Sequence, residues 1–314
     1  MVADVGGTNT RLALFDESSR QFDAVAQYRN AAHRSLEEVI EQWLAGLDGE
    51  RPSRACIAAA APPTPGDRVS MINIGWSFSC RELADRFSLR EFAWLNDFQA
   101  NAHSLPHLDP GDLDVIHAGM ETGHNALAIV GPGTGLGGAT LQWVDGVPIA
   151  DDSEPGHAGL SPGTDLEVEI FRLLLPEHGN IYAELLVSGA GLARLYETLA
   201  RINGLAPAPL APPEVSARAL QGDDELCVTA LKTFCALLGS ACGDYVLSNG
   251  AYGGLFIAGG IVPKMVPFLR NSDFLQRFRN KGAMESHLSS VPVHVITTSH
   301  PGLIGAAHAP LQPG

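Results

Sequence analysis

The apolar positions along this chain repeat with two periods, one typical of helices and one typical of strands. Residues 35–47 place Leu36, Val39, Ile40, Trp43, Leu44 and Leu47 on one face of a helix. Ser79 and Glu82 have the spacing of a capping box, which predicts the start of a second helix there. Strands are predicted at 11–15, 24–28, 55–60 and 91–95. The N-terminal part therefore reads β-β-β-α-β-β-α-β-α.

The second half begins near a loop at 106–110 and continues the same alternation of strands and helices. A long apolar helix is predicted at 226–247, and its apolar faces are expected in the core. A strand at 255–258 leads into Gly259-Gly260 and a helix with Pro263 in its first turn. Residues 206–213 hold four prolines and predict a surface loop. Further strands are predicted at 126–130, 138–144, 147–150 and 291–296, and further helices at 165–175, 191–201, 213–220 and after Pro301.

The chain has 314 residues, a net charge of −15 and a hydrophobic content of 45 %. This length and hydrophobicity predict a packed core and room for two domains. The acidic balance argues against nucleic acid as a partner, because such binding needs basic patches. Neither a secretory signal nor a membrane span opens the chain, so a cytoplasmic protein is expected, with no membrane partner. The five cysteines contain no C-x-x-C pair, and no zinc site is expected. Cys235 and Cys242, seven residues apart in an apolar helical stretch, are predicted to be buried, reduced thiols.

Two glycine-rich turns carry the most specific signal. The first spans 4–9 and reads Asp-Val-Gly-Gly-Thr-Asn, and the second spans 131–138 and reads Gly-Pro-Gly-Thr-Gly-Leu-Gly-Gly. Glycine allows positive φ and leaves no Cβ in the way, so successive N–H groups can converge on an anion. Two such turns between β segments, each with a threonine, predict two domains that hold one polyphosphate.

This pair of turns resembles the phosphate-1 and phosphate-2 motifs of the actin–hexokinase–heat-shock-ATPase superfamily. Further motifs resemble the bacterial glucokinase family, in its order and spacing along the whole chain. They are Asn73-Ile74-Gly75-Trp76, Leu95-Asn96-Asp97-Phe98, Glu154-Pro155-Gly156-His157, Glu184 with Ser188-Gly189-Ala190-Gly191, the stretch 256–263 and Pro301-Gly302-Leu303-Ile304-Gly305. The resemblance implies an α/β, two-domain actin-like ATPase (ribonuclease H-like) fold with a central cleft. The small domain is expected at 1–107 plus 298–314 and the large domain at 108–297.

The resemblance implies that Asp97 is the general base that takes the proton of the sugar hydroxyl. From position alone, a helix N-cap is the commoner role for an aspartate between a strand and a helix. Sugar hydroxyls need planar polar partners, because an unpaired buried hydroxyl is costly. By resemblance these partners are Asn73, Asn96, Asp97, Glu154, His157 and Glu184. Pro155 stands where relatives usually have glycine.

The same resemblance implies that Asp4 holds Mg²⁺ through water. The phosphates of ATP are expected at backbone and hydroxyl donors of Gly6, Gly7, Thr8, Asn9, Gly133, Thr134, Gly135, Gly259 and Gly260. Arg11 is more simply the member of a structural ion pair than a phosphate ligand. Only three residues precede Asp4, so the first strand is expected to be short.

The implied function is ATP-dependent phosphorylation of D-glucose to glucose 6-phosphate, by a homodimer, with glucose closing the cleft. Three alternatives stay open. The chain could phosphorylate another hexose, since the motifs specify chemistry better than substrate. It could be a non-catalytic sugar-sensing regulator, although the chain is expected to have no room for a DNA-binding module. A carboxylate kinase is disfavoured, because Glu154 and Glu184 would repel an anionic substrate.

Overall fold

The computed structural model describes residues 1–49, 51–62, 66–71, 73–120 and 126–311. The chain forms two compact units, which are described one at a time. Unit 1 comprises Met1–Asp109, Trp143–Asp152 and Thr298–Gly314, and unit 2 comprises Pro110–Gln142 and Ser153–Thr297. The small domain expected from the sequence ends at 314, and its last three residues, 312–314, lie outside the described residues.

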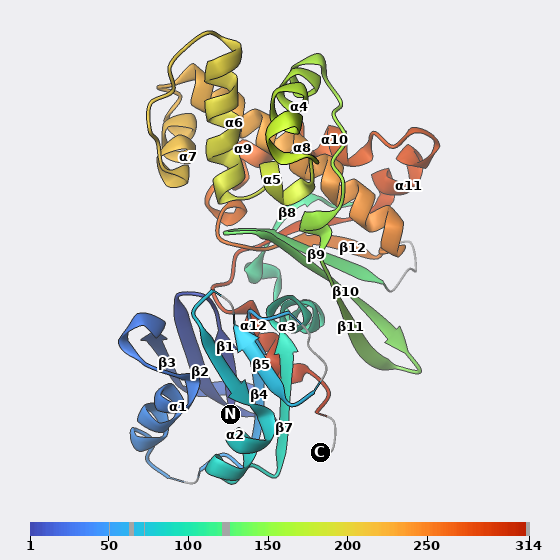
Figure 1. Cartoon of the computed structure of the whole chain (residues 1–314). Coiled ribbons are helices and arrows are strands. Elements are labelled where there is room, and N and C mark those ends of the chain that lie inside the picture. The colour runs from blue at the N-terminus through green and yellow to red at the C-terminus, as the bar shows by residue number, and fades with distance from the viewer. Residues whose placement is uncertain (50, 63–65, 72, 121–125, 312–314) are drawn as a thin grey trace. The chain divides into compact units, whose positions relative to one another are not determined.

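Unit 1 is built on a mixed sheet with the strand order β3-β2-β1-β4-β7 (Figure 1). The three strands β1, β4 and β7 are parallel, whereas β2 and β3 are antiparallel to their neighbours. A separate hairpin joins β5 and β6. The bounds are β1 Val2–Val5, β2 Asn9–Asp16, β3 Gln21–Arg29, β4 Arg54–Ala59, β5 Arg68–Met71, β6 Trp76–Ser79 and β7 Glu91–Asn96.

Helices cover both faces of this sheet, so the central strands are apolar on both sides. One core packs α1 against residues such as Ala3, Val5 and Ile57, and the other packs α12 against Val2 and Cys56. The predicted face of α1 is buried, except that Leu47 follows the end of the helix. The bounds are η1 Asn30–Ala32, α1 Leu36–Ala45, α2 Cys80–Phe87, α3 Asp97–Ser104, η2 Leu105–His107 and α12 Pro301–His308.

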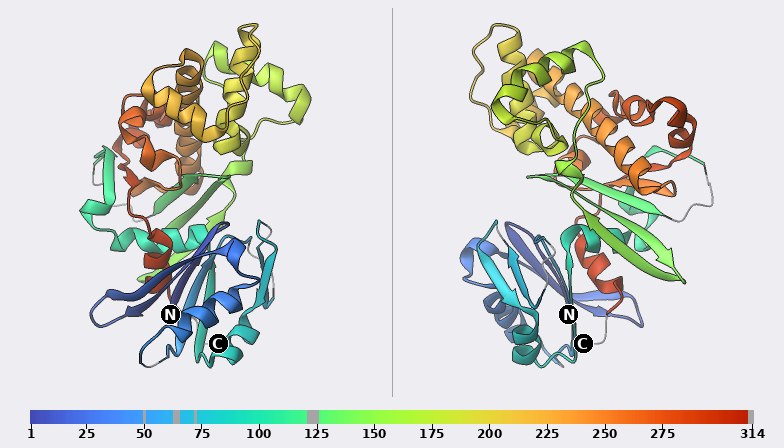
Figure 2. Two further views of the ribbon diagram at one scale, coloured as in Figure 1. Left: turned by 90° about the vertical axis from the view of Figure 1, so that its left-hand side faces the viewer. Right: turned by 45° about the vertical axis from the view of Figure 1, so that its right-hand side comes forward.

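The C-terminal helix α12 returns to unit 1 and lies beside α3, as the views in Figures 1 and 2 show. The two backbones approach so closely that a Cβ atom at Gly305 would overlap the carbonyl oxygen of Ala100. Glycine is therefore required at this crossing. The first turn of α12 also brings Gly302 against Asp4, whose Cγ lies 2.9 Å from the place a Cβ would take.

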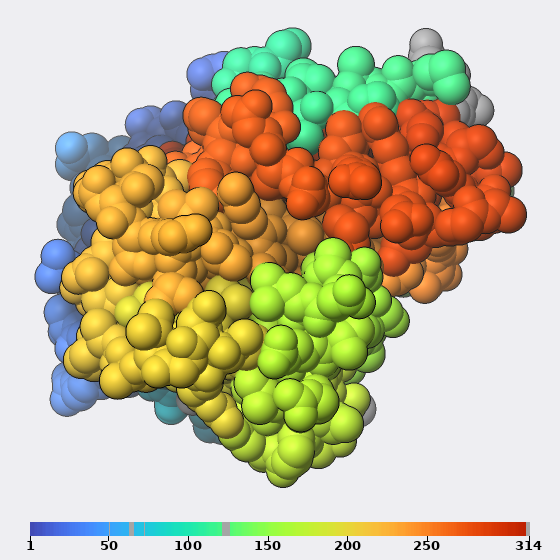
Figure 3. Space-filling view, turned by 90° about the horizontal axis from the view of Figure 1, so that it is seen from above, coloured from blue at the N-terminus to red at the C-terminus, as the bar shows by residue number. Residues whose placement is uncertain are grey.

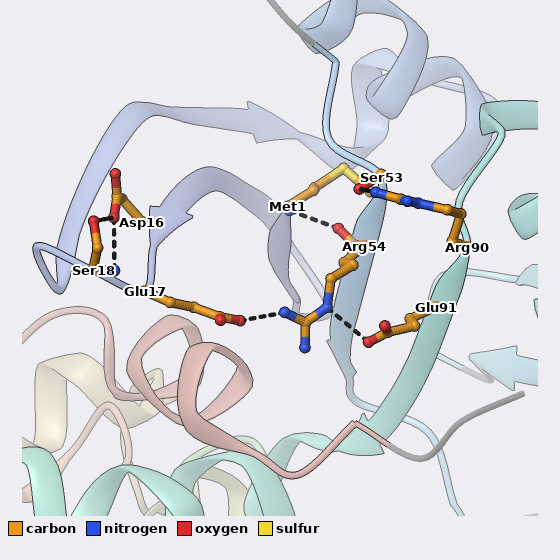
Figure 4. Close-up of polar contacts among 8 residues, drawn as sticks. All are labelled: Met1, Asp16, Glu17, Ser18, Ser53, Arg54, Arg90 and Glu91. Atoms are coloured by element: carbon orange, nitrogen blue, oxygen red, sulfur yellow. Dashed lines mark hydrogen bonds and ion pairs between the residues drawn. The ribbon is translucent and has the colours of Figure 1, made fainter.

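Polar contacts join the amino ends of the parallel strands (Figure 4). Arg54 in β4 donates to Glu17 at 2.6 Å and to Glu91 of β7 at 2.7 Å. The ammonium group of Met1 donates to the Arg54 carbonyl oxygen at 2.8 Å. Although β1 is as short as expected, all four of its residues pair with both β2 and β4.

Unit 2 is built on a second mixed sheet, with the order β11-β10-β9-β12-β13-β8. The strands β9, β12 and β13 are parallel, and β10 and β8 are antiparallel to their neighbours. The bounds are β8 Leu113–His117, β9 Leu127–Pro132, β10 Leu136–Val144, β11 Val147–Ser153, β12 Gly254–Ile257 and β13 Val293–Ile296. The residues Trp143–Asp152 group with unit 1 rather than with the large domain expected from the sequence. There, Gln99 of α3 donates to the Ala150 carbonyl oxygen at 3.3 Å.

The helices of unit 2 surround the long α8, and Figure 3 shows their outer face. Among the described residues, α8 is the helix that is long and apolar enough to cross a membrane, but most of it is buried in unit 2, as in a soluble protein. Cys235 and Cys242 lie in it as buried free thiols, as predicted. The bounds are η3 Pro110–Asp112, η4 Pro155–His157, α4 Asp165–His178, α5 Ala183–Leu186, α6 Gly189–Ile202, α7 Pro212–Gln221, α8 Glu225–Asn249, η5 Val262–Lys264, α9 Val266–Arg270, α10 Phe274–Arg279, η6 Gly282–Met284 and α11 Glu285–Ser290.

The sequence pattern predicted most of these elements but missed several short ones. The edge strand β8, one strand of the β5–β6 hairpin, and the short helices α5, α10 and α11 were not predicted. The helix predicted after Gly259-Gly260 is wrong in kind, because a 3₁₀ turn, η5, comes first and the five-residue α9 follows. Elements of four to six residues are too short to show a period.

Candidate active site

The first glycine-rich turn joins β1 to β2, and hydrogen bonds from Asn30 hold its backbone. The Asn30 side chain donates to the Gly6 carbonyl oxygen at 2.7 Å and accepts from the Thr10 hydroxyl at 2.8 Å. Its backbone N–H donates to the Thr8 carbonyl oxygen at 2.9 Å. Asn30 is buried, while Gly7 and Thr8 are exposed at the tip of the turn. The turn is thus anchored by its carbonyl groups, and the exposed tip can face a ligand.

Asp4 lies in β1, opposite Arg11 of β2 in the register of the sheet. The two side chains form an ion pair of 3.5 Å, which supports the structural role predicted for Arg11. Burial raises the pKa of the Asp4 carboxyl group, and the nearby Arg11 and His300 oppose that rise. A buried carboxylate with a raised pKa gains from a cation beside it. Asp4 therefore fits the role of a Mg²⁺ ligand.

Asn96 ends β7 and Asp97 begins α3, and the structure separates their roles. The N-cap of α3 is Asn96, whose side chain accepts from the Phe98 N–H at 2.8 Å, while Gln99 accepts from the Asn96 N–H at 3.1 Å. The Asn96 amide also donates to the Ala61 carbonyl oxygen at 2.9 Å. The alternative in which Asp97 is the N-cap is therefore wrong. Asp97 is instead the first residue of the helix, and its carboxylate accepts a hydrogen bond of 3.1 Å from the neighbouring Phe98 N–H.

Register brings these residues of unit 1 to one edge of the sheet. Val5 pairs with Ala59, and Ala59 pairs with Asn96. The phosphate-1 turn and Asp97 therefore follow the same end of β1 and β7, two strand spacings or roughly 10 Å apart. The carboxyl edge of parallel strands is where open α/β sheets bind ligands. Asn73 also comes close, since a Cβ atom at Gly7 would lie 3.9 Å from the Asn73 Cβ.

The second glycine-rich turn connects β9 to β10 in unit 2 and is shorter than the sequence pattern indicated. Pro132 still belongs to β9 and Leu136 already belongs to β10, which leaves 133–135 as the turn. Gly133 donates to the Gly135 carbonyl oxygen at 2.8 Å. Thr134 is exposed at the tip, as Thr8 is in the first turn.

Glu154 and His157 flank the 3₁₀ turn η4, also in unit 2. Their side chains are 68 % and 64 % exposed, and the His157 Nδ1 lies 3.8 Å from the Glu154 carboxylate. The His157 ring stacks on Tyr182, with centroids 5.7 Å apart. Both polar groups are therefore open to a ligand, on a turn of defined shape. Pro155 suits this turn, because its ring supplies the first-turn φ and lies over Gly138.

Gly259 and Gly260 follow β12, which is parallel to β9. A Cβ atom at Gly259 would overlap the Pro132 carbonyl oxygen, and Gly259 has a φ of +89°, so only glycine fits there. Beside these glycines lies a cavity of about 570 Å³, a volume typical of ligand pockets. It opens between the second turn, the start of α6, the helix α7 and η5. Its lining includes Thr134, Gly260, Pro212, Ala217, Ile261 and Lys264.

The structure thus forms two groups of predicted residues, each within one unit. Unit 1 holds Asp4, Gly6, Gly7, Thr8, Asn9, Asn73, Asn96 and Asp97, and unit 2 holds Gly133, Thr134, Gly135, Glu154, His157, Glu184, Gly259 and Gly260. Sequence reasoning missed Asn30, Gln99 and Lys264. Only Gln99 carried a signal, since it has the capping-box spacing from Asn96. The loop predicted at 206–213 ends earlier in the structure, because Pro212 and Pro213 already begin α7, the helix predicted at 213–220.

Two mixed sheets, each with a glycine-rich turn at the end of a strand, define the actin-like class of sugar kinases. A crystal structure of a glucokinase from an Antarctic psychrotroph superimposes with a TM-score of 0.89 at 38 % identity, covering 98 % of this chain and 97 % of that one. A ROK family glucokinase from Streptomyces griseus, in complex with glucose and AMPPNP, has a similar fold, with a TM-score of 0.62 at 19 % identity over 97 % of this chain and 96 % of that one.

The sequence comparisons are more specific than the fold. The family model for glucokinase matches residues 1–313. The glucokinase of Saccharophagus degradans is 36 % identical over 310 residues, which cover 98 % of this chain and 96 % of that protein. The chain belongs to the glucokinase family.

Proposed function

We propose that this protein transfers the γ-phosphoryl group of ATP to the primary hydroxyl of D-glucose. The observation that carries the proposal is the position of Asp97 at the carboxyl edge of the unit 1 sheet. Asn96 and Gln99 cap the helix α3 there, so Asp97 is not needed as its N-cap. Its carboxylate is an acceptor when ionised and can orient the sugar hydroxyl. The new O–P bond forms as the bond to the β-phosphate oxygen breaks, ADP leaves, and the hydroxyl proton passes to Asp97.

The sugar ligands proposed are Asn73, Asn96, Asp97, Glu154, His157 and Glu184. The exposed polar groups of Glu154 and His157 support this assignment. So does the close packing of Gly156, the central residue of η4, against Glu184, whose Cβ lies 3.2 Å from the place a Cβ of residue 156 would take. Carboxylates and amides accept and donate in a plane, so a few of them satisfy several hydroxyls. The Asn96 amide already has two protein partners, so it can offer a sugar only its second hydrogen or lone pair.

ATP is proposed to bind with its phosphates at the two glycine-rich turns and its base in the cavity of unit 2. The apolar lining from Pro212, Ala217 and Ile261 suits a purine ring. Lys264 is the cationic side chain among the lining residues, and the described lining residues include no carboxylate that would repel phosphate. Asp4 would hold Mg²⁺, which neutralises phosphate charge when bound.

Turnover tests the proposal directly. Purified protein is assayed for ADP formation with MgATP and glucose, mannose, fructose or acetate. The proposal expects the highest kcat/KM with glucose. A preference for another hexose would favour the first alternative, activity with acetate would favour a carboxylate kinase, and glucose binding without turnover would favour a regulator. Omitting Mg²⁺ should abolish turnover.

Two further parts of the proposal concern assembly and location. We expect a homodimer in the cytoplasm. Light scattering during size-exclusion chromatography tests the first, and a mass near 33.2 kDa, that of one chain, would contradict it. Cell fractionation tests the second.

A further inference from the structure

Glu184 makes a contact that a sugar ligand alone would not need. Its Oε2 accepts a hydrogen bond of 2.8 Å from the Leu136 N–H, directly after the phosphate-2 turn. The same carboxylate packs against Gly135 so closely that a Cβ atom there would displace it. A hydrogen bond to an ionised acceptor is about twice as strong as a neutral one. Glu184 therefore helps to hold the turn in its shape.

The segment of residues 184–189 makes a second contact with the phosphate-2 turn. At the end of that segment, the Gly189 N–H donates to the Gly133 carbonyl oxygen at 2.8 Å. Between the two contacts, α5 makes a short, buried link, in which Val187 donates to the Ala183 carbonyl oxygen at 2.7 Å. Both sides of the turn, at Gly133 and at Leu136, are thus attached to one segment of six residues.

The other side of this segment faces the turn that bears Glu154 and His157. A Cβ atom at Gly156 would lie 3.2 Å from the Glu184 Cβ and 2.5 Å from the Leu136 carbonyl oxygen. The Ala183 N–H donates to the Ala158 carbonyl oxygen at 2.9 Å, and His157 stacks on Tyr182 just before α5. Glu184 thus lies between the turn that bears Glu154 and His157, two of the proposed sugar ligands, and the proposed phosphate turn, all within unit 2.

We propose that Glu184 is a positioning residue that couples the binding of glucose to the binding of the nucleotide. The inference rests on the proposed function, because it assigns the two ligands to the two sides of Glu184. Among the described residues, no hydrogen bond is recorded at the Glu184 Oε1, which leaves that oxygen for a sugar hydroxyl. A sugar bound there removes water from the carboxylate, and a hydrogen bond strengthens when its surroundings lose water. The bond to Leu136 then holds the turn more firmly for phosphate.

Coupling of this kind is reciprocal, because each ligand changes the Kd of the other by the same factor, so one coupling factor describes it. Calorimetry gives the Kd of the ATP analogue AMPPNP with Mg²⁺, with and without saturating glucose. For the wild type, we expect glucose to tighten nucleotide binding by about 5-fold or more. Glu184→Ala should bring that factor close to one and weaken nucleotide binding even without sugar. Glu184→Gln, which keeps a neutral acceptor for the Leu136 N–H, should retain an intermediate factor.

Glu154→Gln is the matched control, because Glu154 is a proposed sugar ligand on the same side but does not contact the phosphate-2 turn among the described contacts. It should weaken glucose binding and keep the wild-type coupling factor. A Glu184→Ala protein with altered glucose affinity but unchanged nucleotide affinity and coupling would overturn the inference. The inference would also be overturned if glucose left the Kd of AMPPNP unchanged in the wild-type protein. If Glu184→Ala does not fold, the same two criteria apply to Glu184→Gln. An absence of glucose-dependent turnover in the wild type would instead defeat the proposed function.

Discussion

Thr10 and Asn30 are joined by a buried hydrogen bond of 2.8 Å, from the threonine hydroxyl to the amide oxygen. This bond fixes the Asn30 amide so that its nitrogen faces Gly6 in the phosphate-1 turn, 2.7 Å from the carbonyl oxygen. Two residues that no motif singles out thereby determine the shape of a turn that a motif does single out.

Asn30→Ala should therefore weaken both the fold and the nucleotide site. The change leaves the Thr10 hydroxyl and the Gly6 carbonyl without their partner, at a cost of about 1–3 kcal/mol in the free energy of unfolding. We expect a raised KM for ATP with little change in the Kd for glucose. Thr10→Val is the comparison, because it removes only the bond that orients the Asn30 amide, and we expect a smaller rise in the KM for ATP than with Asn30→Ala. Wild-type ATP kinetics in Asn30→Ala would contradict this role.

Asp97→Ala should reduce kcat by about 10² to 10⁴-fold while sparing ATP affinity, since a general base typically contributes that much. Because Asn96 caps α3, the substitution should change the unfolding temperature little. Asn96→Ala provides the contrast, since loss of an N-cap costs about 1 kcal/mol of stability. Steady-state kinetics and thermal unfolding of both variants are the measurements. A wild-type kcat for Asp97→Ala would exclude the assignment.

Glu154→Gln and His157→Ala should each raise the KM for glucose more than the KM for ATP. Both side chains are largely exposed, so their replacement leaves the backbone of the η4 turn in place, and His157→Ala removes in addition the ring that stacks on Tyr182. The comparison of the two KM values for each variant is the measurement. An equal rise in both would show that these residues act through the structure of unit 2 instead.

Acid should destabilise unit 1 through two histidines near α12. Burial lowers the pKa of His103 to about 4, and burial, followed by His308, Arg20 and His103, lowers the pKa of His107 to about 4. The unfolded chain then binds more protons than the folded one, so stability falls as the pH drops from about 6.5 toward 4. For the buried His103 the loss is on the order of 2 kcal/mol.

Unfolding by urea at several pH values measures this loss. His103→Asn removes one of the two groups and should flatten the dependence between pH 6.5 and 4. His33→Asn is the control, since His33 is not one of the histidines near α12. An identical slope in His103→Asn and wild type would show that His103 does not contribute.

Gly305→Ala should destabilise unit 1 strongly, because the added methyl group would overlap the Ala100 backbone and push α12 away from α3. We expect a loss of about 3 kcal/mol, larger than the roughly 1 kcal/mol that alanine gains over glycine in a helix. Gly111→Ala serves as control, because a Cβ there meets no atom within 4 Å. Equal unfolding temperatures for Gly305→Ala and wild type would refute the close crossing.

By itself, the sequence determined the α/β class, the family and the positions of the long elements. A helix such as α1 has enough turns for its apolar face to show as a period, and a motif such as Leu95-Asn96-Asp97-Phe98 is specific because it occurs with the others in order. The end of β7 was predicted at residue 95, one residue before its observed end at Asn96, because the polar pair Asn96-Asp97 interrupts the apolar run there.

Only the tertiary structure decided how these pieces serve the site. It assigned the cap of α3 to Asn96 rather than Asp97, and it placed the buried Asn30 against the phosphate-1 turn. It also made α7, beginning with Pro212 and Pro213, one wall of a cavity. It also attached Glu184 to Leu136 across 48 residues of chain. Such contacts depend on which backbone groups remain unpaired once the sheets have formed, and a linear pattern does not contain that information.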